Sequence, residues 1–143
     1  MDFINGVELT TLKIISNSKG DIFHALKKSD TNFQEFGEAY FSRINYMEIK
    51  GWKKHTLMTL NIIVPVGDIK FVMYDDRQES QTCGNYMNIT IGEKNYNRLT
   101  IPPMIWFAFQ GISSNNLLLN IANIEHLKSE AENKSLEQIR FDW

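Results

Sequence analysis

The sequence has few of the features that mark exported, disulfide-bonded or membrane proteins. It contains a single cysteine, Cys83, which excludes an internal disulfide and suits a reducing compartment. No apolar run approaches the ~20 residues that a membrane-spanning helix needs. The first six residues include an acid, Asp2, and lack a positively charged stretch followed by an apolar one, so no export signal is visible. We therefore expect a cytoplasmic protein with no membrane partner.

A strong excess of charge is also missing. The net charge at pH 7 is -2, which gives no reason to expect a nucleic-acid partner. Hydrophobic residues make up 43% and charged residues 22%, as is usual for a folded globular protein. With 143 residues the chain has the size of one domain, and we expect residues 1–143 to form it. Local basic clusters still allow an anionic ligand.

The dominant pattern is the alternation of apolar and polar residues with a period of two. Met87–Ile91 alternates as a half-buried strand should. Leu60–Val66 is a continuous apolar run, and Val66-Gly67-Asp68 predicts a tight hairpin turn into a strand over Ile69–Tyr74. Further strands are expected at Glu8–Ile15, Asp21–Leu26, Glu38–Tyr46, Tyr96–Ile101, Ile105–Phe109 and Leu117–Ala122. About nine short strands favour an all-β sandwich or barrel, and only Ser129–Gln138 predicts a short helix.

Several motifs from the middle of the chain onward match one family in order and spacing. They are Gly51-Trp52-Lys53-Lys54-His55, Val66-Gly67-Asp68, Tyr74-Asp75-Asp76-Arg77, Ile101-Pro102-Pro103 with Trp106, and Asp142-Trp143. With these motifs the sequence resembles the dTDP-4-dehydrorhamnose 3,5-epimerase family, and within it a short subgroup with a Gly-Trp-Lys-x-His segment. The likeness runs from about Gly20 onward. It implies a cupin-type jelly-roll barrel, a homodimer, a nucleotide-linked sugar as ligand, and neither cofactor nor metal.

The chemistry implied by the resemblance is proton abstraction next to a ketone. A histidine takes a proton from the carbon beside a 4-keto group, and a tyrosine returns one to the opposite face. Imidazole suits the role of base because it titrates near neutral pH. The enolate must be stabilised by a cation or by hydrogen-bond donors. His55 alone among the three histidines lies in the Gly-Trp-Lys-x-His segment, so we expect it to be the base.

Basic residues near His55 are candidates for holding a diphosphate or an enolate oxygen. Lys50, Lys53 and Lys54 form a cluster, and Lys53, next to Trp52, is the one we select. Clustered lysines are also common at solvated strand edges. Lys19 precedes Gly20 at the position where the family has an arginine that helps to hold the nucleotide.

Aromatic and polar strand residues complete the expected substrate-binding set. Trp52 and Trp106 could stack on a base or sugar, although aromatic residues in strands usually belong to the core. Tyr40 lies on a polar strand face with Glu38 and Ser42, and it is a second candidate catalytic residue, as a proton donor. If the strand continues regularly from His55, Asn61 shares its face.

Metal binding is not supported by the spacing of ligands. Metal-dependent cupins need a His-x-His pair, a following Glu and a distant third His. Thr56-Leu57 follow His55, Phe107 stands where the later histidine would fall, and His24 and His126 lie at unrelated positions.

The sequence departs from the family at two functional positions. Alignment on Ile101-Pro102 and Ile112-Ser113 puts Asn120 where the family has the proton-donating tyrosine, and an amide can bind a sugar oxygen but cannot supply that proton. The C-terminal extension that carries the carboxylate behind the histidine is also missing, so we expect His55 to lack an orienting partner.

Three hypotheses follow from the sequence. The first is a sugar-nucleotide epimerase or keto-isomerase that uses His55, in the synthesis of surface polysaccharides. The second is a non-catalytic cupin that binds a sugar nucleotide or carbohydrate. The third is a structural dimer with an empty barrel.

Overall fold

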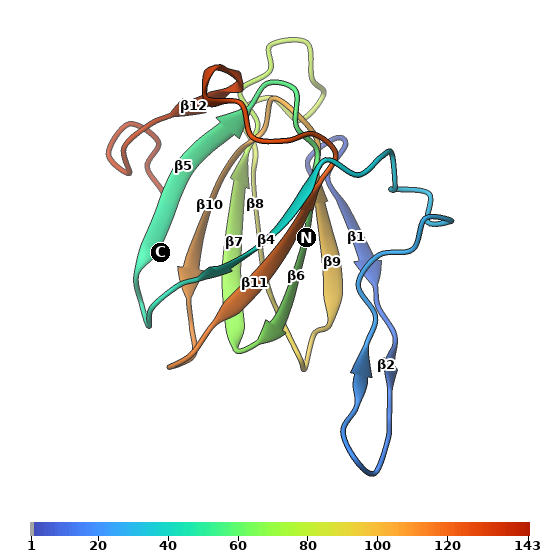
Figure 1. Cartoon of the computed structure of the whole chain (residues 1–143). Helices are drawn as coiled ribbons and strands as arrows, with labels where there is room; N and C mark the ends of the chain where they lie inside the picture. Colours follow the sequence, from blue (N-terminus) through green and yellow to red (C-terminus); the bar gives the residue numbers. More distant parts are fainter. Residues whose placement is uncertain (1) are drawn as a thin grey trace.

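The computed structural model describes residues 2–143, and these form an almost entirely β structure (Figure 1). Within them twelve strands follow one another along the chain. They are β1 (Glu8–Thr11), β2 (Ile14–Ile15), β3 (Ile22–Phe23), β4 (Glu38–Arg43), β5 (Ile49–His55), β6 (Leu60–Val66), β7 (Asp68–Tyr74), β8 (Tyr86–Gly92), β9 (Asn97–Ile101), β10 (Trp106–Gly111), β11 (Leu117–Ala122) and β12 (Ala131–Asn133). The expected all-β jelly roll is confirmed.

Two five-stranded antiparallel sheets pack face to face. One has the order β1-β9-β6-β11-β4 and the other β12-β5-β10-β7-β8. The tight turn predicted at Val66-Gly67-Asp68 exists, but the predicted hairpin was wrong. β6 and β7 belong to different sheets, and Gly67, with a φ of 77°, lets the chain cross between them. A jelly roll connects its two layers in this way, so a short turn here does not pair the strands it joins.

The core between the sheets follows from the alternation within strands. Met87, Ile89 and Ile91 of β8 are buried, whereas the intervening Asn88 and Thr90 are exposed, as the sequence predicted. The main cluster also takes in apolar side chains from β6, β7, β9, β10 and β11. It fills the part of the sandwich between β6, β9, β7 and β8.

A second apolar cluster lies on the opposite face of the β5-β10-β7 sheet. Its buried members are Trp52, Val72, Trp106, Ala108 and Ile139. Residues 134–143 cross this face and supply Leu136, Phe141 and Trp143. The helix predicted over Ser129–Gln138 was wrong, because the only helical segment among the described residues is a 3-10 turn at Lys128–Glu130. Packing of apolar side chains against an exposed sheet face overrides the helix preference of this charged stretch.

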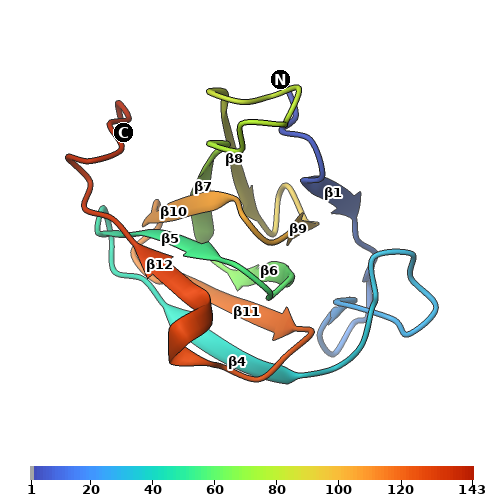
Figure 2. The ribbon, with the colours of Figure 1, turned by 90° about the horizontal axis from the view of Figure 1, so that it is seen from above.

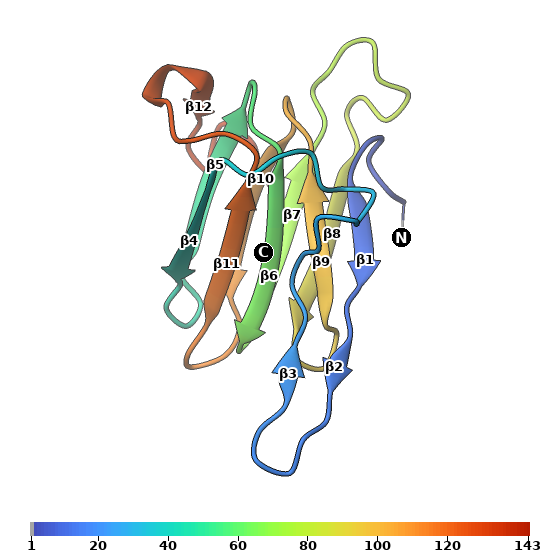
Figure 3. The same ribbon diagram turned by 45° about the vertical axis from the view of Figure 1, so that its right-hand side comes forward.

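A hairpin arm, residues 12–26, projects from the body of the molecule (Figures 1 and 3). The strand predicted over Glu8–Ile15 is therefore divided in two. β1 pairs with β9 in one of the five-stranded sheets, and β2 pairs with β3 in the arm. Tyr96 anchors the base of the arm, since its hydroxyl donates to the carbonyl of His24 at 2.7 Å and its ring meets Phe23 edge to face. Lys19 lies in the turn of the arm and is exposed.

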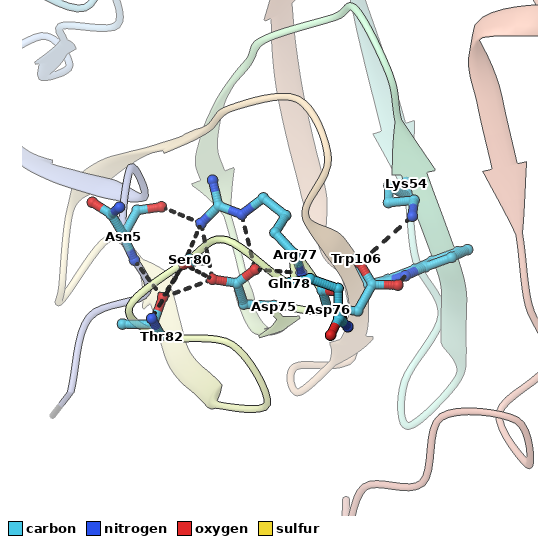
Figure 4. A network of polar contacts seen from close by, with 9 residues as sticks. All are labelled: Asn5, Lys54, Asp75, Asp76, Arg77, Gln78, Ser80, Thr82 and Trp106. Atoms are coloured by element: carbon cyan, nitrogen blue, oxygen red, sulfur yellow. Dashed lines mark hydrogen bonds and ion pairs between the residues drawn. The ribbon is translucent and has the colours of Figure 1, made fainter.

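The loop between β7 and β8 is organised by one buried carboxylate (Figure 4). Asp75 is fully buried and accepts hydrogen bonds from Arg77 Nε at 2.8 Å, Ser80 Oγ at 2.6 Å and Thr82 Oγ1 at 2.7 Å. Arg77 also donates to the carbonyl of Asn5, which ties the N-terminal segment to the loop. Burial alone would raise the pKa of Asp75, but the hydrogen bonds from Arg77, Ser80 and Thr82 hold it well below its usual range.

Asp75→Asn is expected to lower the free energy of unfolding at pH 7 by about 3 kcal/mol, because it leaves Arg77 and two hydroxyl groups without a buried anion. Urea denaturation measures the difference. Glu79→Gln removes the same charge from an exposed side chain of the same loop and should change stability by less than about 0.5 kcal/mol. Equal effects of the two substitutions would contradict this role of Asp75.

Candidate active site

A cavity of about 340 Å³ lies between the two sheets, at the side of the sandwich that the main core does not fill. From above, β4 and β11 lie across from β5 and β10 (Figure 2). The cavity is lined by Tyr40, Ser42, Lys50, Gly51, Trp52, Lys53, His55, Leu60, Ile62, Phe107, Phe109, Leu118, Asn120, Asn133 and Lys134. Its floor is apolar and its polar groups come from a few strands, as is usual for sites that bind small molecules.

The orientation of β5 decides which of its side chains enter the cavity. Lys53 pairs with Phe107 and Lys54 with Trp106 on β10, so Lys53 and His55 face inward while Trp52 and Lys54 face outward. Gly51 has a φ of 144°, and a Cβ there would lie 2.4 Å from the Cβ of Ala108. Glycine is therefore required where β5 crosses β10 this closely, next to a shift in the register of the two strands.

His55 is the last residue of β5. Its side chain is buried and pairs with a carboxylate from a distant part of the chain. Its Nδ1 contacts Glu130 Oε1, and its ring stacks at 6.0 Å on Phe107. Because the carboxylate accepts the Nδ1 proton, the unprotonated nitrogen of a neutral His55 is Nε2. Among residues 2–143 the structure records no hydrogen bond to Nε2. The imidazole is therefore held in a fixed tautomer and orientation, with Nε2 available as a base.

Glu130 is itself held by backbone donors. Its Oε2 accepts the N–H groups of Thr56, Leu57 and Met58 at 3.2, 3.1 and 3.3 Å, and its side chain is almost completely buried. Burial raises the pKa of Glu130, but the hydrogen bond from His55 and those from the backbone outweigh it, and the pKa lies below its ordinary value of 4.5. Glu130 is thus an anion at neutral pH, placed where it would stabilise an imidazolium at His55.

The expectation that His55 lacks an orienting carboxylate was wrong. The resemblance implied a carboxylate on a longer C-terminal extension. In the structure the carboxylate belongs to Glu130, in the 3-10 turn before β12, 75 residues after His55. Glu130 gave no local signal, because it lies in a charged stretch that looks like a solvated helix. Phe107 was also missed, since an apolar strand residue looks like any other core residue.

The electrostatic character of the cavity is positive. Lys50, Lys53 and Lys134 line it, and none of the described lining residues is Asp or Glu. Lys50 Nζ donates to the carbonyl of Arg43 at 2.6 Å, and Lys134 Nζ lies 4.9 Å from the ring of Trp106 on the far side of the sheet. The side chain of Lys53 makes no ion pair or hydrogen bond with any of residues 2–143. Its ammonium group is the cation best placed to meet an anion in the cavity.

Tyr40 and Asn120 form the wall opposite His55. They are directly paired in the register of β4 and β11, and Asn120 Nδ2 donates to the Tyr40 hydroxyl oxygen at 3.1 Å. Tyr40 is 44% exposed, whereas Asn120 is buried. Because the Tyr40 oxygen accepts from Asn120, its own hydrogen remains available to a ligand. Asn120 therefore binds a tyrosine from the neighbouring strand.

Three of the residues selected from the sequence lie outside the cavity. Lys19 is on the hairpin arm, and Trp106 belongs to the second apolar cluster, where its Nε1 donates to Asp76 at 2.8 Å. Asn61 faces away from the cavity and accepts from Thr100 at 2.7 Å. The prediction that Asn61 shares a strand face with His55 was wrong. β5 ends at His55 and β6 begins only at Leu60, so no regular strand joins the two residues.

Trp52 occupies an intermediate position. It borders the cavity, but its indole lies in the second apolar cluster and its Nε1 donates to the carbonyl of Ile139 at 3.0 Å. Both faces of this sheet are buried, so alternation could not reveal that the two tryptophans face outward. No set of three or more His, Cys, Asp and Glu side chains within residues 2–143 is arranged to hold a metal ion.

Comparison with known proteins places this chain in a family. The structure matches the dTDP sugar isomerase of Desulfovibrio desulfuricans with a TM-score of 0.94 and 36% sequence identity, over 98% of this chain and 92% of the other. The chain belongs to the dTDP-sugar isomerase family, within the dTDP-4-dehydrorhamnose 3,5-epimerase-like cupins. The family resemblance inferred from the motifs is thus confirmed. No protein-family model matches the sequence.

Two more distant similarities agree with the family assignment. A probable low-salt glycan biosynthesis epimerase of Haloferax volcanii is 27% identical over 123 residues, which cover 84% of this chain and 79% of that protein. The dTDP-4-dehydrorhamnose 3,5-epimerase of Sulfolobus tokodaii shares the fold, with a TM-score of 0.86 at 21% identity over 99% of this chain and 84% of the other. No helix in the described part of this family member is long and apolar enough to cross a membrane.

Glu130→Gln is expected to lower the free energy of unfolding at pH 7 by about 2 kcal/mol, because the amide replaces an anion that accepts four hydrogen bonds. The folded-state pKa of Glu130 is lowered, so its stabilisation is fully present above pH 4.5 and is lost as the pH falls through the folded-state value. Urea denaturation of both proteins across the acidic range measures this dependence.

Glu132→Gln is the matched control, since Glu132 is an exposed member of an ion pair two residues away. That substitution should cost less than about 1 kcal/mol at every pH. A wild-type advantage over Glu130→Gln that grows as the pH falls below 4.5 would refute the lowered pKa.

Proposed function

We propose that this protein is an isomerase of nucleotide-linked 4-keto sugars that abstracts the proton on a carbon next to the ketone, in the synthesis of surface polysaccharides. One observation carries the proposal: a His55–Glu130 pair faces a cavity whose cations are lysines and whose described lining contains no carboxylate. The pair supplies an oriented base, and the positive lining suits a ligand that carries a diphosphate. The family assignment and the glycan-biosynthesis relative support the same reaction class.

The proton abstraction uses the fixed geometry of His55. Nε2 takes the proton from the carbon beside the ketone, and the electron pair of that C–H bond moves into the carbonyl to form an enolate. Glu130 stabilises the resulting imidazolium through Nδ1. Lys53 faces the same cavity without a recorded partner, and we assign it to the enolate oxygen or to the diphosphate. The charge that develops on the substrate thus meets an ammonium group in a largely apolar site.

Tyr40 is the proton donor in this proposal. It lines the cavity from the sheet opposite the one that carries His55, so a sugar bound between them has the two groups on opposite faces. Donation from Tyr40 after abstraction by His55 inverts the carbon centre. Asn120 Nδ2 donates to the Tyr40 oxygen and stabilises the phenolate that remains. The pair Tyr40–Asn120 thereby replaces the tyrosine that the family carries at position 120.

The quaternary state and location belong to the same proposal. β1 is an edge strand of its sheet, and the arm exposes Ile15 and Ile22, so we propose a homodimer that covers these surfaces. Lys19 lies in the turn of the arm and would contact a nucleotide only in the cavity of the second copy.

We place the protein, with residues 1–143 acting as one domain, in the cytoplasm, where sugar nucleotides are made and where the unpaired Cys83 is compatible with a reducing milieu.

The base is tested by hydrogen exchange. Wild-type protein incubated in D₂O with a 4-keto sugar nucleotide should wash deuterium into the carbon next to the ketone, as followed by NMR or mass spectrometry. His55→Asn keeps shape and polarity but removes the basic nitrogen, so exchange should fall by at least about 10²-fold. Affinity for the ligand should fall much less, by about 0.5–1.5 kcal/mol, because one neutral contact is lost.

His126→Asn is the control, because His126 is exposed and lies outside the cavity. It should exchange at the wild-type rate. Exchange that survives His55→Asn would show that another residue is the base. Tight binding of sugar nucleotides without any exchange by the wild type would show a binding protein instead of an isomerase.

The proton donor is tested by separating exchange from inversion. In Tyr40→Phe, His55 still abstracts the proton, so exchange with retention should continue while the inverted product falls by about 10²-fold. Chiral analysis of the sugar product measures both outcomes. Tyr46→Phe, which alters an exposed tyrosine outside the cavity, should leave both unchanged. An unchanged rate of inversion in Tyr40→Phe would exclude Tyr40 as the donor.

A further inference from the structure

The last ten residues of the sequence form a clasp (residues 134–143) over the outer face of the sheet that carries His55. The clasp follows β12 directly, and β12 follows Glu130 directly. Backbone hydrogen bonds join its first residue to β5 in both directions, at 3.0 Å from Trp52 N to the Lys134 oxygen and at 3.1 Å from Lys134 N to the Trp52 oxygen. The clasp is therefore continuous with the segment that carries the carboxylate partner of His55.

Aromatic contacts fasten the far end of the clasp. Trp143 meets Trp52 with ring centroids 6.2 Å apart and Phe141 edge to face at 5.4 Å. Phe141 also lies 5.8 Å from the ring of Tyr86 on β8, and the Tyr86 hydroxyl donates to the carbonyl of Arg140 at 3.0 Å. Lys70 lies 5.8 Å from the ring of Trp143. The clasp thus crosses from β5 to β8 and is held at both ends.

The segment between the clasp and Glu130 has little support of its own. β12 is a three-residue edge strand paired only with β5, from Ala131 opposite His55 to Asn133 opposite Lys53. No strand of residues 2–143 lies on its outer side, and edges this short fray easily. A buried carboxylate directly before such an edge strand keeps its hydrogen bonds to residues 55–58 best when the edge is also fixed further along the chain.

Trp52 joins the clasp to the catalytic strand. Its indole packs under Trp143 and donates to the carbonyl of Ile139, while His55, three residues later on the same strand, faces the cavity. Trp143 itself does not line the cavity. Any influence of Trp143 on the reaction is therefore indirect, and it passes through the groups that Trp143 contacts, of which Trp52 and the clasp connect to His55 and Glu130.

We propose that Trp143 is a positioning residue, which fixes the clasp and thereby keeps Glu130 in contact with His55. The kinetic consequence rests on the proposed function of His55 as the base, but the contact itself is testable without substrate. Loss of Trp143 releases the clasp and β12, and Glu130 no longer holds His55 in one tautomer. The Asp142-Trp143 motif then supports the His55–Glu130 contact from a distance.

The test compares Trp143→Ala with Trp143→Phe in protein labelled with ¹⁵N at histidine. In the wild type, the Nδ1 proton that His55 donates to Glu130 should give a protected, strongly downfield NMR signal, because a carboxylate accepts it. Glu130→Gln assigns the signal by moving it upfield, because an amide oxygen is a weaker acceptor than a carboxylate. Trp143→Ala should lose or broaden the same signal while the signals of the main core persist. Trp143→Phe, which keeps an aromatic ring, should retain it.

Kinetics with a 4-keto sugar nucleotide give the second readout. Trp143→Ala should lower kcat for exchange about tenfold, because the base is misplaced. KM should change less than kcat, because Asn133 and Lys134 are the cavity-lining residues that belong to the released segment, and the rest of the lining stays in place. In the Glu130→Gln background the same substitution should have no further effect, since the ionic contact that it protects is already lost. Phe36→Ala removes an exposed aromatic residue outside both the cavity and the clasp, and should change neither readout.

Each outcome decides the proposal. A Trp143→Ala protein with a full His55 signal, or with an effect that adds to that of Glu130→Gln, would show that Trp143 serves stability alone. Loss of the signal in a protein whose wild type catalyses no exchange would uphold the clasp and refute the proposed function. If Trp143→Ala does not fold, Trp143→Leu keeps the apolar volume without the ring stacking, and the same signal comparison decides.

Discussion

The Glu130 carboxylate is the group on which the arrangement of the site depends. A buried anion is stable only when donors replace its water shell, and here one imidazole and three backbone N–H groups do so. Those donors come from His55 at the end of β5 and from residues 56–58 that follow it. A single side chain therefore fixes the orientation of His55, shapes the connection to β6, and joins the last segment of the chain to the centre of the sandwich. The same ionic state that orients His55 also stabilises the fold.

β5 has the cavity on one face and the second apolar cluster on the other, and this explains its composition. Its inward side chains, Lys53 and His55, are polar and face a cavity, whereas its outward side chains pack beneath residues 134–143. Lys54, on the outer face, is held between Asp76 and Glu132 and lies over the ring of Trp106. Because both faces are covered, the strand is held firmly enough to present reactive groups, which a strand at an open edge would not do.

The cavity exists because the apolar core occupies only part of the space between the sheets. Near β7, β8 and β9 the inward residues are large and apolar, while Ser42, Tyr40 and Asn120 take inward positions on β4 and β11. Smaller or polar side chains at these positions leave room for a ligand and supply hydrogen-bonding groups to it. The Tyr40–Asn120 pair illustrates how a register between neighbouring strands brings together two residues 80 positions apart.

The sequence by itself determined the all-β fold, the family and the identity of the histidine at the site. Period-two alternation, as in Met87–Ile91, is a local property that any half-buried strand displays, and the Gly-Trp-Lys-x-His segment lies within five consecutive residues. The tertiary structure alone decided which sheet each strand joins, that Trp52 and Trp106 face outward, and that Asn61 lies outside the cavity. It also decided that Glu130 pairs with His55, because the donors that hold this buried carboxylate come from residues 72 to 75 positions away. A strand's partners, its covered faces and the burial of a charge are set by long-range packing, which leaves no periodic trace in the neighbouring residues.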